Sequence, residues 1–286
     1  LIKAAMESEY TKDNPQTWKL AADIEYQYYT KIENESKADP DNNELKKKYI
    51  ETSAKLLSYC IKYDSLLVLD AEMKPEDKDK EHKIYQPKGV NSAIQLLQAA
   101  QNYSNSENQE ELKQGAKYAE IFINAMENSN LMKDFKHAEL EGWKTYSKAF
   151  RAQSYLNIEG TPEETIVNAY KALFNTNFKG IAYQSLMNYY REKDKAKQNL
   201  YLQEGIDALK GDAEQKDLRA NFVTILMQNQ FQAGDKEGFM KTAEIMKNEF
   251  ADDENAVNAY LMEGQFAFEA KDYETAKKAF LAGSEK

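Results

Sequence analysis

Apolar residues recur three and four positions apart along nearly the whole chain, and no stretch alternates between apolar and polar residues for long. The first spacing places apolar side chains on one face of an α-helix, whereas a half-buried strand needs strict alternation. The pattern therefore predicts an all-α protein, with more than about 65% helix and no sheet.

Two long helices are expected near the start of the chain. The first spans residues 15–37, with Asn14 as its N-cap and Pro15 at its first position, and the second spans residues 43–69. The mixed-charge run in residues 70–88 predicts a solvated loop. Residues 1–88 are thus expected to form an irregular N-terminal helical region. Residues 89–286 are expected to form helix-pair repeats that continue it as one solenoid.

The expected helices after Gly89 are shorter and closely paired. They fall at residues 90–103, 107–127, 134–158, 162–174, 181–192, 195–210, 216–233, 236–250, 254–270 and 272–283. Turns inside the last four pairs begin at Gly160, Lys193, Gly234 and Lys271, at spacings of 33, 41 and 37 residues. Such periods are typical of solenoids built from helix pairs.

The last pair carries the most specific residues of the repeat. Residues 257–283 contain Tyr260, Gly264, Phe268, Asp272, Tyr273, Ala276 and Phe280. This arrangement resembles the tetratricopeptide repeat, where an aromatic residue and a glycine open the first helix and an alanine lies early in the second. Gly264 and Ala276 would let the paired helices approach closely, and Tyr260 and Phe280 would fill the gaps to the next pair. Asp272 would cap the second helix.

The resemblance is looser elsewhere. Met227 replaces the glycine in residues 220–250, and residues 136–210 keep only the turn spacing and helix lengths. At the start, Pro15 and Trp18 again resemble the opening of such a repeat, but the two helices that follow are too long for it. The whole chain is similar to tetratricopeptide proteins of Gram-negative bacteria that are often exported. This resemblance implies an α-solenoid in the periplasm or cell envelope, with the cytoplasm as the alternative.

Composition excludes several classes of function. A net charge of −10 over 286 residues repels phosphate backbones and anionic lipid surfaces, so no nucleic-acid partner is expected. No apolar run is long enough for membrane insertion. One cysteine cannot form an internal disulfide or a zinc site, and no phosphate-binding or nucleophile motif occurs.

No residue argues for catalysis, a cofactor or a metal, so the protein is not expected to be an enzyme. His82 falls in the charged run and is expected to be solvated. His137 lies four residues before Glu141, a spacing that supplies only two metal ligands. Cys60 lies on an apolar stripe in mid-helix and is expected to be a small buried hydrophobe.

The resemblance implies a groove lined by the first helices of the repeats, where a protein or peptide partner binds. If Tyr260 and Gly264 mark the buried side of their helix, other positions face this groove. They are Asn221, Thr224, Gln228, Phe231, Asn258, Leu261, Gln265 and Phe268. Because this set has no cation, it predicts a neutral or basic peptide rather than an acidic tail.

The expected function is thus a scaffold for protein–protein interaction. The alternative is an exported helical module that binds a small ligand or glycan in the corner between the N-terminal helices and the repeats. Both chain ends have the pattern of cuts inside a longer array. Self-association is therefore expected through residues 1–8 or 272–283.

Overall fold

The computed structural model describes all 286 residues and is built from helices alone. Helices contain 78% of the residues, arranged as thirteen α-helices and two 3₁₀ turns, and there are no strands. The all-α expectation is confirmed. None of the helices is both long and apolar enough to cross a bilayer.

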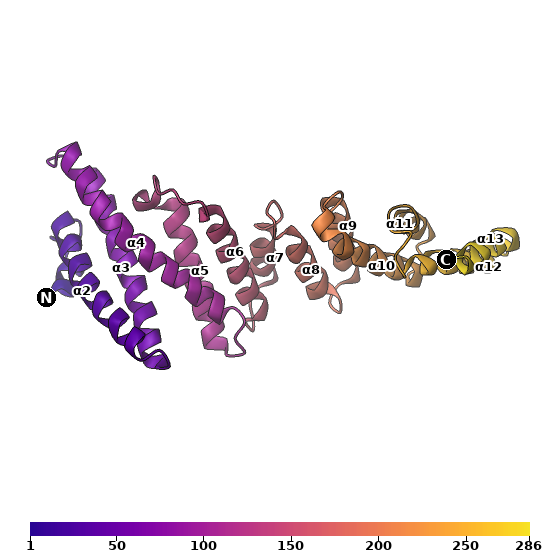
Figure 1. Cartoon of the computed structure of the whole chain (residues 1–286), viewed down its shortest axis with the longest axis horizontal. Coiled ribbons are helices and arrows are strands. Elements are labelled where there is room, and N and C mark those ends of the chain that lie inside the picture. The colour runs from indigo at the N-terminus through magenta and orange to yellow at the C-terminus, as the bar shows by residue number, and fades with distance from the viewer. The chain divides into compact units, whose positions relative to one another are not determined.

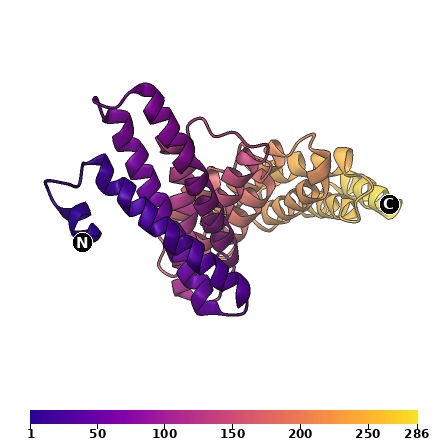
Figure 2. The same cartoon turned by 60° about the vertical axis from the view of Figure 1, so that its left-hand side comes forward.

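The chain divides into two compact units, residues 1–169 and 170–286, and the division falls within helix α7 (Glu163–Lys171). The first unit opens with the short helix α1 (Ile2–Glu7). Five longer helices follow: α2 (Pro15–Ala38), α3 (Asn43–Leu69), α4 (Pro75–Tyr103), α5 (Gln109–Asn128) and α6 (Leu140–Asn157). Helices that are consecutive in this series pack against one another (Figure 1), and Figure 2 shows the long ones from a second side.

The core of the first unit lies between α3, α4 and α5. Its fully buried side chains include Leu56, Leu57, Tyr63, Leu96 and Phe122. A short 3₁₀ turn, Asn130–Met132, follows α5 and brings Leu131 against Gly89 of α4. A methyl group on Gly89 would lie 2.7 Å from the Leu131 side chain, so this close approach depends on glycine.

The prediction that residues 70–88 form a charged loop is wrong. Only residues 70–74 connect α3 to α4, and the rest of the run is the first half of α4. Pro75 suits the first helical position, and Glu76 and Asp77 lie in the first turn, where the helix dipole favours negative charge. The helix continues through Pro87. The boundary expected between residues 88 and 89 therefore falls inside α4.

The second unit is a series of shorter helices. They are α8 (Lys179–Tyr190), α9 (Lys195–Ala208), α10 (Lys216–Gln232), α11 (Lys236–Glu249), α12 (Ala256–Glu269) and α13 (Tyr273–Ser284), and each packs against the next. Within the last three pairs the second helix begins at an aspartate. Asp194, Asp235 and Asp272 each accept a hydrogen bond from the backbone N–H three residues on. The expected caps are thus confirmed, and the helix bounds agree with the sequence to within a few residues.

Gly264 lies at a close approach of paired helices, as expected. A methyl group at this position would lie 2.6 Å from the Phe280 ring. The Phe280 ring packs on Gly264 within its own pair and stays 40% exposed, so its expected role in filling the gap to a next pair stays a prediction. The preceding interface has its own aromatic cluster, in which Phe231 and Phe239 pack against Phe266 of α12.

We predict that Gly264→Leu destabilises the protein by about 1–3 kcal/mol, because the new side chain displaces the Phe280 ring. Urea unfolding measures this loss. Gly142→Leu is the matched control, because a methyl group there meets only the edge of Tyr146 at 3.9 Å. Equal stability of the two variants would contradict the close approach.

Self-association stays a prediction. Tyr273, Phe280 and Leu281 of α13 are exposed by 60%, 40% and 54%, and Leu1 is fully exposed. Exposed apolar side chains concentrated on one terminal helix favour contact with another molecule. Sedimentation at high concentration should show an oligomer that Tyr273→Ser with Leu281→Ser dissociates. A monomer at every concentration would contradict this expectation.

Candidate functional site

The groove residues expected in the second unit differ in their exposure. Asn221, Leu261, Gln265 and Phe268 are exposed, and Gln228 and Asn258 are partly exposed. Several already contact neighbours in the chain. The Gln265 amide donates to Glu269, and the Phe268 ring lies against Tyr273.

Thr224 and Phe231 differ from the other six residues. Thr224 is buried, and its hydroxyl donates to the carbonyl of Ala220 one turn earlier in the helix. Phe231 is partly exposed, with its ring centroid 4.8 Å from that of Phe266. That the eight residues line a groove for a partner stays a prediction.

The first unit contains a groove that the sequence analysis did not identify. It runs between α3 and α5 and has a volume of about 560 Å³. Its apolar residues are Ala54, Leu57, Ile61, Ile121 and Ala125, and its polar residues are Ser58, Lys62, Ser65, Asn124, Asn128, Ser129 and Asn130.

The polar side of this groove consists mainly of hydroxyls and amides. Asn124 and Asn128 are exposed one turn apart on α5, and the Asn128 amide donates to the Asn124 oxygen. Lys62 is the only charged residue in the lining. Groups of this kind can both donate and accept hydrogen bonds, as an exposed peptide backbone requires.

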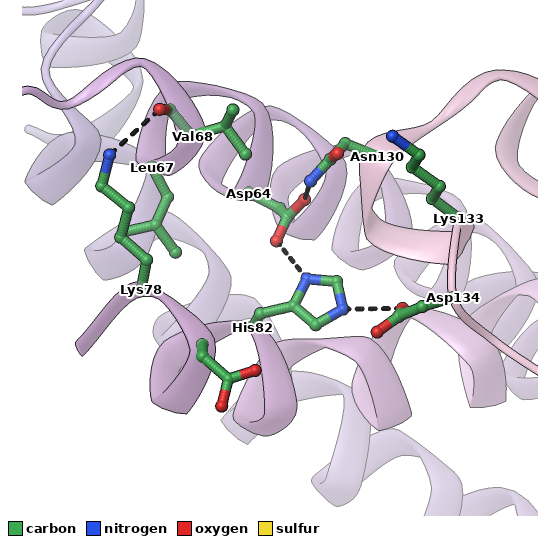
Figure 3. A pocket seen from close by; sticks show the side chains of 9 residues that line it. Asp64, Leu67, Val68, Lys78, His82, Asn130, Lys133 and Asp134 are labelled. Atoms are coloured by element: carbon green, nitrogen blue, oxygen red, sulfur yellow. Dashed lines mark hydrogen bonds and ion pairs between the residues drawn. The ribbon is translucent and has the colours of Figure 1, made fainter. Parts of the chain in front are cut away.

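A second, smaller cleft of about 290 Å³ adjoins the groove at Asn130. His82 of α4 occupies its centre (Figure 3), with Asp64 of α3 on one side and Asp134 on the other. Lys78, Asp79 and Lys133 also line the cleft. The aspartates, the lysines and the histidine give this cleft more charged residues than the groove.

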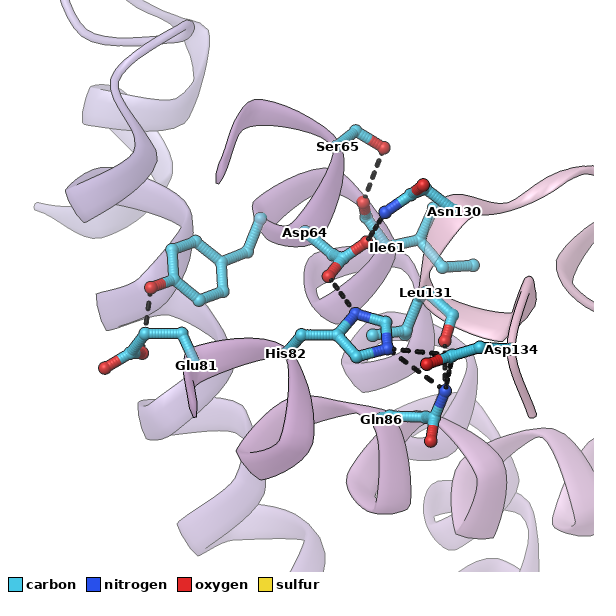
Figure 4. Close-up of polar contacts among 10 residues, drawn as sticks. Ile61, Asp64, Ser65, Glu81, His82, Gln86, Asn130, Leu131 and Asp134 are labelled. Carbon is cyan, nitrogen blue, oxygen red and sulfur yellow. Dashed lines mark hydrogen bonds and ion pairs between the residues drawn. The ribbon is translucent and has the colours of Figure 1, made fainter. Parts of the chain in front are cut away.

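His82 links α3 to the segment that follows α5 (Figure 4). Its Nδ1 lies 2.7 Å from Asp64, and its Nε2 lies 3.0 Å from Asp134. Asp64 is buried, and its other oxygen accepts a hydrogen bond from Asn130. The Gln86 amide donates to Asp134 and to the carbonyl of Leu131. The expectation that His82 is solvated is therefore wrong.

The network favours the charged form of His82. Burial acts to lower the pKa of His82, but the hydrogen bonds and charges of Asp64 and Asp134 outweigh it and raise that pKa above its usual value. For Asp134, burial acts to raise the pKa, while the hydrogen bonds from His82 and Gln86 lower it overall. Since both ring nitrogens face carboxylates, the imidazolium can donate on both sides.

This arrangement holds α3, α4 and the segment after α5 together. Both ring nitrogens of His82 are engaged with carboxylates, so neither is free to accept a proton in this arrangement. Cys60 is completely buried, and burial raises the pKa of its thiol to about 12. Its expected role as a buried hydrophobe is confirmed.

The residues weighed as metal ligands are used in other ways. The His137 ring stacks on Trp143 at 4.4 Å, and its Nδ1 accepts a hydrogen bond from the backbone of Glu139. No group of three or more potential ligands lies close enough together to hold a metal ion. The His82 cleft is likewise a hydrogen-bonded cluster without the ligand set of a metal site.

A helical spacing in the sequence could have located the His82 network. Glu81, His82, Tyr85, Gln86 and Gly89 recur at intervals of three and four, so they share one face of a helix. The many charged residues between them favoured the interpretation of this segment as a loop. Asp64 and Asp134 are far from it in sequence, and only the packing of α3 and the segment after α5 brings them together.

No family model matches the chain. No curated protein is similar enough to it to count as a match.

We predict that His82 makes stability depend on pH near neutrality. The pKa of His82 is higher in the folded protein than in the unfolded chain. Its contribution to the free energy of unfolding is therefore complete below the usual histidine pKa, about 6.5, and is lost as the pH rises through the pKa of the folded state. Asp134 has the opposite effect, because its pKa is lowered in the folded protein. Its contribution to the free energy of unfolding is present above the usual aspartate pKa and is lost as the pH falls through the pKa of the folded state.

Urea unfolding of the wild type and His82→Gln between about pH 5.5 and about pH 8.5 measures this effect. The advantage of the wild type should shrink as the pH rises, because all other titrating groups are common to both proteins. A difference that stays constant, or that grows with pH, would contradict the charged network.

Proposed function

We propose that the protein is a tetratricopeptide-like scaffold that binds an uncharged peptide segment in the groove between α3 and α5. The observation that carries this proposal is the composition of the groove: apolar side chains, a row of hydroxyls and amides, and one lysine. Such a lining can hold apolar side chains while its amides hydrogen-bond to the backbone of the peptide.

The repeat geometry of the second unit supports the tetratricopeptide-like part of the proposal. Aspartate caps recur at the turns inside three successive helix pairs. In the last pair, Gly264 of the first helix lies under the Phe280 ring of the second, as the resemblance implies. Stacked helix pairs of this type present continuous surfaces that are suited to extended partners.

Charge argues for an uncharged partner. The groove has no carboxylate to pair with a basic peptide, and Lys62 lies close to Asp13, with 3.6 Å between the charged atoms. Few ion pairs can form, so binding should depend weakly on salt. The exposed amides of Asn221 and Gln265 and the partly exposed amides of Gln228 and Asn258 offer similar chemistry in the second unit and form the competing surface.

The second candidate function is binding of a small ligand or glycan by the N-terminal helices. A pocket beneath α1, which contains a buried carboxylate oxygen without a partner, favours it. A location in the periplasm or cell envelope stays a prediction that cell fractionation would test.

A random peptide library selected against the purified chain supplies the probe for the first proposal. Selected peptides should be rich in apolar residues and carry little net charge. Asn124→Ala with Asn128→Ala should weaken binding about tenfold, because two hydrogen bonds to the peptide are lost. Fluorescence anisotropy measures the affinity.

The matched variant is Asn221→Ala with Asn258→Ala, which removes two amides from the second unit. It should leave the affinity unchanged if the groove of the first unit is the site. The opposite pattern would assign binding to the second unit. An affinity that collapses between low and high salt, or peptides rich in one charge, would contradict an uncharged partner. Melting temperatures of both variants should equal that of the wild type.

A further inference from the structure

A pocket of about 480 Å³ lies beneath the short helix α1. Its walls come from α1, α2 and α3, and its apolar side chains include Met6 and Ile24. Trp18 and Tyr59 add two aromatic rings, with centroids 5.9 Å apart and planes at 61°. The volume and the mainly apolar lining match sites that hold small organic molecules.

One carboxylate interrupts this apolar lining. Glu25 lines the pocket and is partly exposed, while its Oε1 is buried and has no hydrogen-bond partner in the chain. A buried acceptor without a donor costs free energy, and a charged one costs more. Burial raises the pKa of Glu25, while the positive charge of Lys55 acts in the opposite direction. Lys55 is exposed and forms no ion pair with Glu25, so the missing donor is not supplied by the chain.

We propose that this pocket binds a small organic cation, whose primary ammonium group donates to Glu25 and whose apolar body lies against Trp18 and Tyr59. A hydrogen bond between an ammonium and a carboxylate is stronger than one between neutral groups. This difference favours an amine over an alcohol of the same shape.

The other charged residues at the pocket do not favour a cation, so we expect Glu25 to determine the preference for one. Lys3 and Glu7 are both exposed on α1, and their charges cancel. Lys55 opposes a bound cation, so its removal should tighten binding. This pocket shares no residue with the groove between α3 and α5, and the two proposals stand or fall separately.

The chain contains two tryptophans, so Trp143→Phe leaves Trp18 as the only one, within the pocket. Phenethylamine is the probe, and phenethyl alcohol is its neutral counterpart. Titration with the amine should change the Trp18 emission and saturate. The alcohol should bind at least about tenfold more weakly. No saturable change with the amine, or equal affinities, would overturn the proposal.

Three variants in this background identify the group responsible. Glu25→Gln should weaken amine binding about tenfold and abolish the preference for amine over alcohol. Lys55→Met should tighten amine binding. Glu35→Gln, which changes a partly exposed carboxylate outside the pocket on the same helix, is the control for net charge and should change nothing. Unchanged binding in Glu25→Gln or weaker binding in Lys55→Met would overturn the assignment, with circular dichroism confirming that each variant is folded.

Discussion

The first unit depends on hydrogen bonds that let tyrosine rings be buried between long helices. The Tyr85 hydroxyl of α4 donates to Asp23 of α2, and the Tyr63 hydroxyl of α3 donates to Glu81 of α4. Both rings are almost fully buried, so each hydroxyl needs a partner. Lys19 of α2 pairs in turn with Glu81, so three helices meet at one carboxylate. These bonds explain why a run rich in charges is an ordered helix.

Helices, turns and caps could be predicted from the sequence because they depend on local signals. Asp194, Asp235 and Asp272 cap helices through neighbours three residues away, and the apolar period gives the helical faces. The first half of α4 was predicted wrongly, although Pro75 and the helical spacing of Tyr85 and Gly89 are local signals for it. Its many charges resemble those of a solvated loop, and the groups that hold its tyrosine and carboxylate in place lie on α2 and α3.

The candidate sites were harder to predict for the same reason. Thr224 and Phe231 have the side chains that a groove needs, yet Thr224 is buried, and the Phe231 ring packs against Phe266. The groove between α3 and α5 joins residues about sixty positions apart, such as Ile61 and Ile121. No spacing within one helix indicates such a pair. Burial of the Glu25 oxygen likewise results from three helices meeting.

The single thiol offers a way to follow the opening of the first unit by itself. Cys60 lies in α3 with no exposed surface, and the chain contains no other cysteine. A thiol reagent can therefore modify the protein only when α3 separates transiently from α2 and α4. The rate of modification measures how often the first unit opens, whatever happens in the second. Modification of this one side chain thus reports local opening of the first unit.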